Sequence, residues 1–139
     1  GFGVACELAV ARLAETAQHT ARLRAQLETG LTGMGATIFG GQAARIPNTC
    51  YFALPDIEGD TLVVKLDKAG FAVAAGAACS SVNPGQSHVL AAMGIDPMLA
   101  RCAVRVSLGR DNTPEQVDDF LRATQRIVAD LRQIGSISL

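Results

Sequence analysis

The sequence lacks the features that mark several large classes of protein. No apolar run approaches the roughly 18 residues needed to span a bilayer, and no basic stretch followed by an apolar segment opens the chain as in a secretion signal. Neither sign of charge dominates, because 12 Lys and Arg residues stand against 13 Asp and Glu residues, a net charge of −1. These absences favour a cytoplasmic protein that binds neither nucleic acid nor membranes.

The cysteines lack the spacing of a metal site. Cys6, Cys50, Cys79 and Cys102 are separated by 44, 29 and 23 residues, so the chain contains no CxxC pair. A chain that is 49% hydrophobic can build its core without disulfides. We therefore expect no metal site and four reduced thiols, most of them small core residues.

What the sequence does contain is enough apolar residue for one packed domain over residues 1–139. A mean hydropathy of +0.26 argues against disorder, and 139 residues suit a single domain with a real core. The chain opens with Gly1, Phe2 and Gly3, and helical apolar spacing begins at once without a capping residue. This opening leads us to expect that the chain is a piece of a longer protein.

Periodicity and turn residues predict an α/β layer of a few strands flanked by two long helices. A Thr-Pro-Glu-Gln sequence from Thr113 to Gln116 supplies a cap, a first-turn proline and a capping-box glutamine for the last helix. We expect strands over residues 36–39, 49–54, 71–75 and 103–108. We expect helices over about 3–30, 58–68, 87–93 and 114–134, with a short turn opened by Asp96 and Pro97.

Only Cys79 stands in a sequence context unlike that of a core cysteine. It lies in a predicted loop, residues 76–86, made almost wholly of Gly, Ala, Ser, Asn and Pro. An accessible thiol on such a loop suits a nucleophile that must reach a partner and then withdraw. Small-residue loops are also common around cysteines without chemical roles, so composition leaves both interpretations open.

Arg105 interrupts a strand whose residues otherwise alternate. Val104, Val106 and Leu108 face one way, and Arg105 and Ser107 face the other. A guanidinium there needs an anionic partner, which is either an internal carboxylate or the carboxylate of a ligand. Arg110, beside Asp111, is interpreted as a structural surface arginine.

The two histidines carry weaker signals. His88 follows the cysteine loop and is interpreted as an exposed capping residue, although it could also orient the loop or lower the pKa of the thiol. His19 is expected on the solvated face of the first helix. The glycines lack the GxGxxG spacing of a phosphate-binding loop.

Several blocks along the chain stand in one order and spacing: residues 1–9 (GFGVACELA), 46–49 (IPNT), 57–60 (IEGD), 77–81 (AACSS), 87–94 (SHVLAAMG), 100–101 (AR), 104–110 (VRVSLGR) and 113–118 (TPEQVD). In these blocks the sequence resembles the C-terminal third of NifS-like cysteine desulfurases, which belong to the class V aminotransferase-related enzymes that use pyridoxal phosphate (PLP). The resemblance covers nearly the whole chain.

The resemblance implies a fold, a reaction and two site residues. The fold is the small C-terminal domain of a PLP fold-type-I enzyme, α/β with a short mixed sheet flanked by two long helices. PLP forms an imine with L-cysteine, and a thiolate attacks the substrate sulfur, which leaves an enzyme persulfide and releases alanine. By position, Cys79 matches the persulfide-carrying cysteine and Arg105 the arginine that holds the substrate carboxylate. Implied partners are an iron–sulfur scaffold or other sulfur acceptor and a second copy of the enzyme.

The sequence departs from the family pattern in the cysteine loop and in its lysines. Val82 stands where the family usually has glycine, and Gln86 where it usually has proline. The PLP lysine of the family lies in an upstream His-Lys pair, whereas Lys65 and Lys68 here do not follow a histidine. We therefore expect PLP to be bound by a missing large domain and this fragment alone to be inactive. The alternatives are a selenocysteine lyase-type relative and a stand-alone persulfide carrier or interaction domain.

Overall fold

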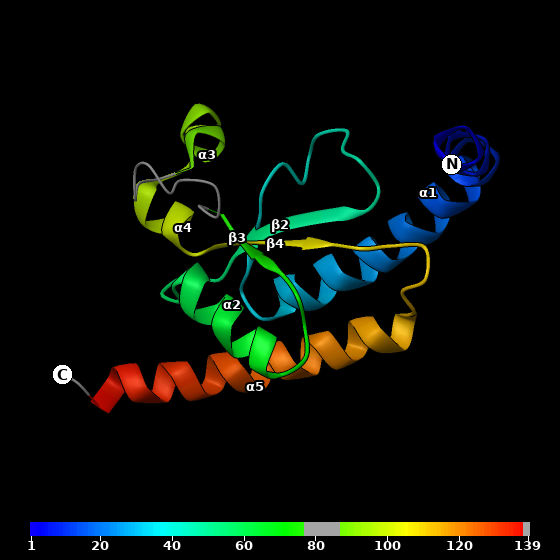
Figure 1. The fold of residues 1–139 in the computed structure, drawn as a ribbon. Coiled ribbons are helices and arrows are strands. Elements are labelled where there is room, and N and C mark those ends of the chain that lie inside the picture. Colours follow the sequence, from blue (N-terminus) through cyan, green and yellow to red (C-terminus); the bar gives the residue numbers. More distant parts are fainter. Residues whose placement is uncertain (77–86, 138–139) are drawn as a thin grey trace.

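A computed structural model of the chain describes residues 1–76 and 87–137, and side chains up to residue 134. Its helices and strands follow the expected alternation and form one sheet in the order β1-β2-β4-β3 (Figure 1). The elements are α1 (Phe2–Gly33), β1 (Thr37–Ile38), β2 (Thr49–Ala53), α2 (Gly59–Lys68), β3 (Ala74–Ala75), α3 (His88–Ala92), α4 (Pro97–Arg101), β4 (Ala103–Ser107) and α5 (Pro114–Ile137).

The α/β class and the two long helices are confirmed, but the expected mixed sheet is antiparallel at every pairing between described strands. Both β2 and β3 run antiparallel to β4, which lies between them. They are therefore parallel to each other without being hydrogen-bonded to each other. The connection from β2 to β3 runs through the helix α2 and leaves room for β4 between the two strands. No parallel hydrogen-bond ladder therefore forms between β2 and β3.

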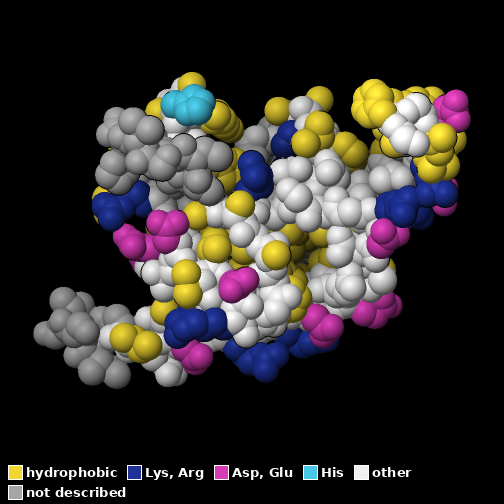
Figure 2. All heavy atoms as spheres, viewed as in Figure 1, with side chains coloured by type: hydrophobic (Ala, Val, Ile, Leu, Met, Phe, Trp, Pro, Cys, Tyr) yellow, Lys and Arg dark blue, Asp and Glu magenta, His cyan; other side chains and the backbone are white. Residues whose placement is uncertain are grey.

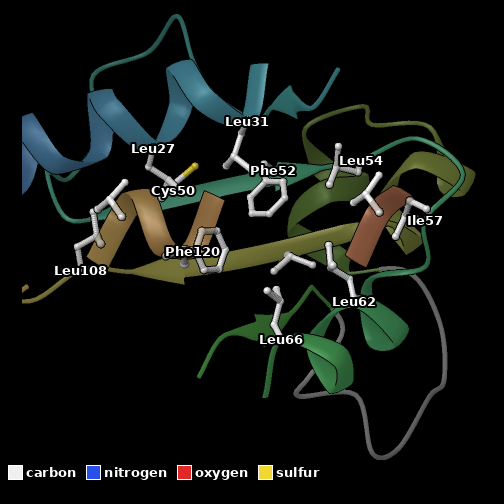
Figure 3. Close-up of a cluster of buried hydrophobic side chains, with 14 of the residues drawn as sticks. Leu27, Leu31, Cys50, Phe52, Leu54, Ile57, Leu62, Leu66, Leu108 and Phe120 are labelled. Carbon is white, nitrogen blue, oxygen red and sulfur yellow. The ribbon is translucent and has the colours of Figure 1, made fainter. Parts of the chain in front are cut away.

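One face of the sheet packs against α1, α2 and α5 and holds the larger core. On this face Cys50 and Phe52 of β2 are fully buried beside Val104 of β4 (Figure 3). Helices contribute Leu27 and Leu31 from α1, Leu62 and Leu66 from α2, and Val117, Phe120 and Val128 from α5. The side of α5 that faces the sheet also carries Leu121, Thr124, Ile127 and Leu131, which are buried or packed against this core.

The other face of the sheet carries a smaller cluster. Phe39, Ala53 and Ala103 are buried there beneath Leu90 of α3 and Ala100 of α4, together with Cys102. Asp96 begins α4 as expected, because its carboxylate accepts hydrogen bonds from the amides of Met98 at 2.9 Å and Leu99 at 3.2 Å. The short helices α3 and α4 cover only part of this face (Figure 1).

The first helix has two unlike halves. Leu23, Leu27 and Leu31 in its second half are at most 2% exposed, because the sheet and α5 cover them. The large apolar residues of its first half, Val4, Leu8 and Leu13 among them, are 46–86% exposed. Their side chains form a hydrophobic group at the start of α1 (Figure 2). The apolar spacing correctly predicted a helix. Its apolar residues are buried only in the second half, where other elements pack against it.

The expected strand 71–75 is shorter than predicted. Gly70 ends α2 with a positive φ of 91°, and the amide of Phe71 closes the helix end by donating to the carbonyl of Leu66 at 2.9 Å. The Phe71 ring then packs edge-on against Phe120, with centroids 5.5 Å apart. The chain consequently reaches β4 only at Ala74, and two residues remain to pair with it.

The start of α2 is pressed against the start of β4. A Cβ added at Gly59 would lie 2.6 Å from the carbonyl oxygen of Ala103 and 3.1 Å from that of Arg101. Both are backbone atoms that cannot swing aside, so this position requires glycine. Within the described part of the chain, no helix is long and apolar enough to cross a membrane.

Candidate active site

Arg105 lies at the centre of the less covered sheet face. In the register of the sheet it is opposite Tyr51 of β2 on one side and Ala74 of β3 on the other. Its neighbours along β4, Val104 and Val106, are buried in the larger core, whereas Arg105 itself is exposed. The predicted alternation of this strand is therefore confirmed, and it directs the guanidinium away from the core.

No carboxylate forms an ion pair with Arg105 among the residues that the structure describes. The ion pairs found there join other groups: Arg24 and Arg45 with Glu28, Arg101 with Glu58, Arg110 with Asp111, and Arg122 with Asp119. Of the two partners considered for Arg105, the internal carboxylate thus gains no support from the described residues. An exposed guanidinium of this kind can bind a carboxylate by donating two parallel hydrogen bonds to it.

Tyr51 is a site residue that the sequence analysis missed. Its ring packs edge-on against Phe39, with centroids 5.2 Å apart and planes at 71°, and its hydroxyl donates to the carbonyl of Gly76 at 3.5 Å. Burial raises the pKa of the phenol, while a hydrogen bond with Ser87 and the charge of Arg105 oppose that rise. The sequence predicted the strand that contains Tyr51, but the position of Tyr51 beside Arg105 depends on the β2–β4 pairing, which the sequence does not reveal.

Gly76 and Ser87 flank the segment that contains Cys79. The amide of Gly76 donates to the carbonyl of Ala103 at 2.8 Å, which holds this residue against the start of β4. At the other end of the segment, the side chain of Ser87 lowers the pKa of the Tyr51 phenol, against the effect of burial. Cys79 itself, with the predicted loop around it, lies outside the described residues. Both flanking residues are nevertheless placed on the face that presents Arg105.

Of the three other cysteines, two are buried and one is exposed on the first helix. Cys50 is fully buried in the larger core, where burial, reinforced by the charge of Glu28, raises its pKa to about 12. Burial also raises the pKa of Cys102, whose sulfur lies 3.4 Å from the carbonyl oxygen of Met98. Cys6 is exposed on α1. Cys50 and Cys102 are thus the core thiols that the sequence predicted.

The remaining polar candidates have structural surroundings. His88 is exposed at the start of α3, as expected, but it does not cap the helix, because Ser87 occupies the cap position. The prediction for His19 was wrong: its ring is half-buried and its Nε2 lies 2.8 Å from the carbonyl oxygen of Asn112, because the turn before α5 folds over this part of α1. Arg110 pairs with Asp111 at 3.2 Å on the surface, in agreement with a structural role.

No described group of residues fits a metal or the PLP aldehyde. Lys65 and Lys68 both lie exposed on α2, away from Arg105's sheet face. A lysine that forms an imine needs a depressed pKa and a pocket, and neither side chain is buried. In the described parts of the chain, no cluster of three or more His, Cys, Asp or Glu side chains could hold a metal ion.

Comparison with known proteins identifies the class to which this sheet and its arginine belong. The model of the aminotransferase class-V family matches residues 1–120, and the chain is therefore a member of that family. Within the family, the similarity is to cysteine desulfurases and to NifS-like proteins.

Three relatives describe the extent of this similarity. The cysteine desulfurase of Gluconacetobacter diazotrophicus is 38% identical over 97% of this chain and 34% of its own length. The cysteine desulfurase NifS of Azotobacter vinelandii is 37% identical over 97% of this chain and 34% of its own length. The X-ray structure of a NifS-like protein from Rickettsia africae is 26% identical, with a TM-score of 0.80, over 93% of this chain and 33% of that one. The chain thus spans about a third of the length of the relatives it matches.

Proposed function

We propose that this chain is the small C-terminal domain of a cysteine desulfurase and that it supplies the sulfur-accepting thiol, Cys79, and the substrate-carboxylate ligand, Arg105. The observation that carries the proposal is the position of Arg105. It is exposed on the sheet face, lacks an ion-pair partner among the described residues, and lies next to Tyr51, whose hydroxyl contacts the residues flanking the Cys79 segment. Membership of the class-V family supports this assignment of roles.

The proposed chemistry is a sulfur transfer between two thiols. Arg105 binds the carboxylate of L-cysteine through two parallel N–H···O bonds and so fixes the amino acid relative to the Cys79 thiolate. The thiolate attacks the substrate sulfur, a new S–S bond forms, and the S–C bond breaks with its electron pair left on the substrate carbon. Protonation of that carbon gives alanine and leaves a persulfide on Cys79.

The group that accepts the electron pair lies outside this chain. The family uses PLP, but Lys65 and Lys68 are exposed on the helix α2 and do not fit as its anchoring lysine. The remainder of the full-length enzyme must therefore provide the PLP site. The fragment alone is expected to bind no PLP, and a borohydride-reducible adduct at either lysine would contradict this expectation.

The persulfide would be passed to an iron–sulfur scaffold protein or another sulfur acceptor, and the full-length enzyme would be a homodimer in the cytoplasm. The free thiols of Cys6, Cys50 and Cys102 favour a reducing compartment. Names of relatives that include NifS and IscS support a role in sulfur supply. Each of these partners is part of the proposal.

The test is a persulfide assay on the full-length enzyme with Cys79→Ser. This variant should lose the persulfide after incubation with L-cysteine, measured by mass spectrometry of trapped peptides, while it still binds PLP. Cys6→Ser is the matched control, because it removes an exposed thiol and should leave the persulfide intact. Sulfide release by Cys79→Ser at the wild-type rate would overturn the assignment. A parallel assay with L-selenocysteine distinguishes a selenocysteine lyase.

A further inference from the structure

The contacts of one hydroxyl group join the two ends of the segment that contains Cys79. Tyr51 donates to the carbonyl of Gly76, the last described residue before this segment, at 3.5 Å. The side chain of Ser87, the first described residue after it, lies near enough to the same hydroxyl to oppose the rise that burial causes in its pKa. Residues 76 and 87 are therefore held near the same atom, on the face that presents Arg105.

The hydroxyl is itself held in a defined position. The edge-on contact with Phe39 fixes the plane of the Tyr51 ring, since the two centroids are only 5.2 Å apart. The backbone of Tyr51 is locked into β2 by pairing with Arg105 of β4. A tyrosine constrained at both ends, by its strand and by its ring, presents its oxygen to one point in space.

The fit at Gly76 is close enough to exclude any side chain. A Cβ at this position would lie 2.6 Å from the Tyr51 hydroxyl oxygen and 2.8 Å from the Cβ of Ala103. The amide of Gly76 is also bonded to the carbonyl of Ala103 at 2.8 Å. Gly76 is thus clamped between the tyrosine and the first residue of β4, two positions before Arg105.

We propose that Tyr51 is a positioning residue, which holds residues 76 and 87 beside Arg105 so that the Cys79 thiol is delivered to a substrate bound by that arginine. This inference rests on the proposed function, because it needs Cys79 as the sulfur acceptor. Tyr51 touches neither substrate nor sulfur in this role. It acts through the two residues that flank the segment.

The proposal predicts a loss of rate without a matching loss of substrate binding. In the full-length enzyme, Tyr51→Phe should slow single-turnover persulfide formation on Cys79 about tenfold, because misplacing a reacting group by about 1 Å can cost up to 100-fold. The KM for L-cysteine should change less than about twofold, since the carboxylate is held by Arg105. Thr49→Val is the matched control: it removes a hydroxyl from the same face of β2, two residues away, and should leave the rate unchanged.

A second variant approaches the same contact from the other side. Gly76→Ala places a methyl group where it meets the Tyr51 oxygen, and it should slow persulfide formation at least as much as Tyr51→Phe. If the two residues act through one contact, the effects in the double variant should be less than multiplicative. Thermal unfolding of each variant checks that the fold is retained. In both variants, the rate at which iodoacetamide alkylates Cys79 without substrate should differ from the wild-type rate.

The outcomes separate the two proposals. A wild-type enzyme that forms no persulfide on Cys79 overturns the proposed function, and this inference with it. A wild-type enzyme that forms the persulfide, together with a Tyr51→Phe variant of equal rate and equal alkylation, overturns the inference alone. A Tyr51→Phe variant whose KM rises in proportion to its loss of rate also overturns it, because the hydroxyl would then serve substrate binding.

Discussion

The two faces of the sheet use the same strands for different purposes. On the covered face, Cys50, Phe52 and Val104 are fully buried among side chains from three helices. On the other face, their immediate neighbours Tyr51 and Arg105 form a polar pair that only short helices approach. Because side chains alternate along a strand, a one-residue step separates the core from the proposed active site. We therefore expect substitutions on the covered face to change stability, and substitutions on the other face to change the proposed activity.

The largest effect on stability is expected on the covered face. Phe52→Ala should lower the free energy of unfolding by about 3–5 kcal/mol, because it leaves a cavity where a fully buried ring had been. Urea unfolding followed by circular dichroism measures the change. Val64→Ala, an apolar truncation at a position 54% exposed, should stay within about 0.5 kcal/mol. Equal losses in both variants would mean that the covered face is not the main source of stability.

On the other face, the loss should appear in activity. In the full-length enzyme, Arg105→Ala should weaken capture of the substrate carboxylate by about 1.5–3 kcal/mol, a rise in KM of roughly 10- to 150-fold. Its free energy of unfolding should change little, since the side chain is exposed. Arg101→Ala removes another arginine, whose partner Glu58 is equally exposed, and serves as the control. An unchanged KM in Arg105→Ala would show that the guanidinium serves the fold.

The buried thiol of Cys50 should make the free energy of unfolding depend on pH. Burial raises the pKa of Cys50 to about 12 from its ordinary value of 9.0, so above pH 9 the unfolded chain loses a proton that the folded chain keeps. The thiol thus contributes stability that is fully present below pH 9 and is lost as pH rises toward 12. Between pH 8 and pH 10.5 the loss should be about 2 kcal/mol. Cys50→Ala should remove this component from the difference between urea unfolding curves at the two pH values; an identical pH dependence in the variant would contradict it.

The smallest effect is expected at α4, which covers part of the sheet face that presents Arg105. Asp96→Ala removes the two hydrogen bonds that cap α4 and should cost about 1 kcal/mol. Asp96→Asn retains an acceptor oxygen and should recover most of the loss. Chemical denaturation of the three proteins provides the measurement. If both substitutions cost the same, the negative charge and not the cap geometry is responsible.

Local patterns predicted most of the elements, and they failed where distant segments meet. The capping box of α5 formed as expected, with the Thr113 amide donating to the Gln116 side chain at 3.2 Å and the Gln116 amide donating to the Thr113 hydroxyl at 3.3 Å. The sheet order was beyond the sequence, because no local pattern shows that β4 lies between β2 and β3. The place of Tyr51 in the site was missed for the same reason, and so was the contact between His19 and Asn112.

The approach of two glycines to Ala103 has a mechanical consequence. Gly59 and Gly76 both contact this residue at distances that leave no room for a methyl group. The beginning of α2, the end of β3 and the first residue of β4 are therefore packed tightly against one another. Because such close packing transmits strain, a displacement of any one of these three segments would shift the other two. Arg105 lies two residues along β4 from Ala103, so a side chain added at Gly59 or Gly76 would push on the strand that carries this guanidinium.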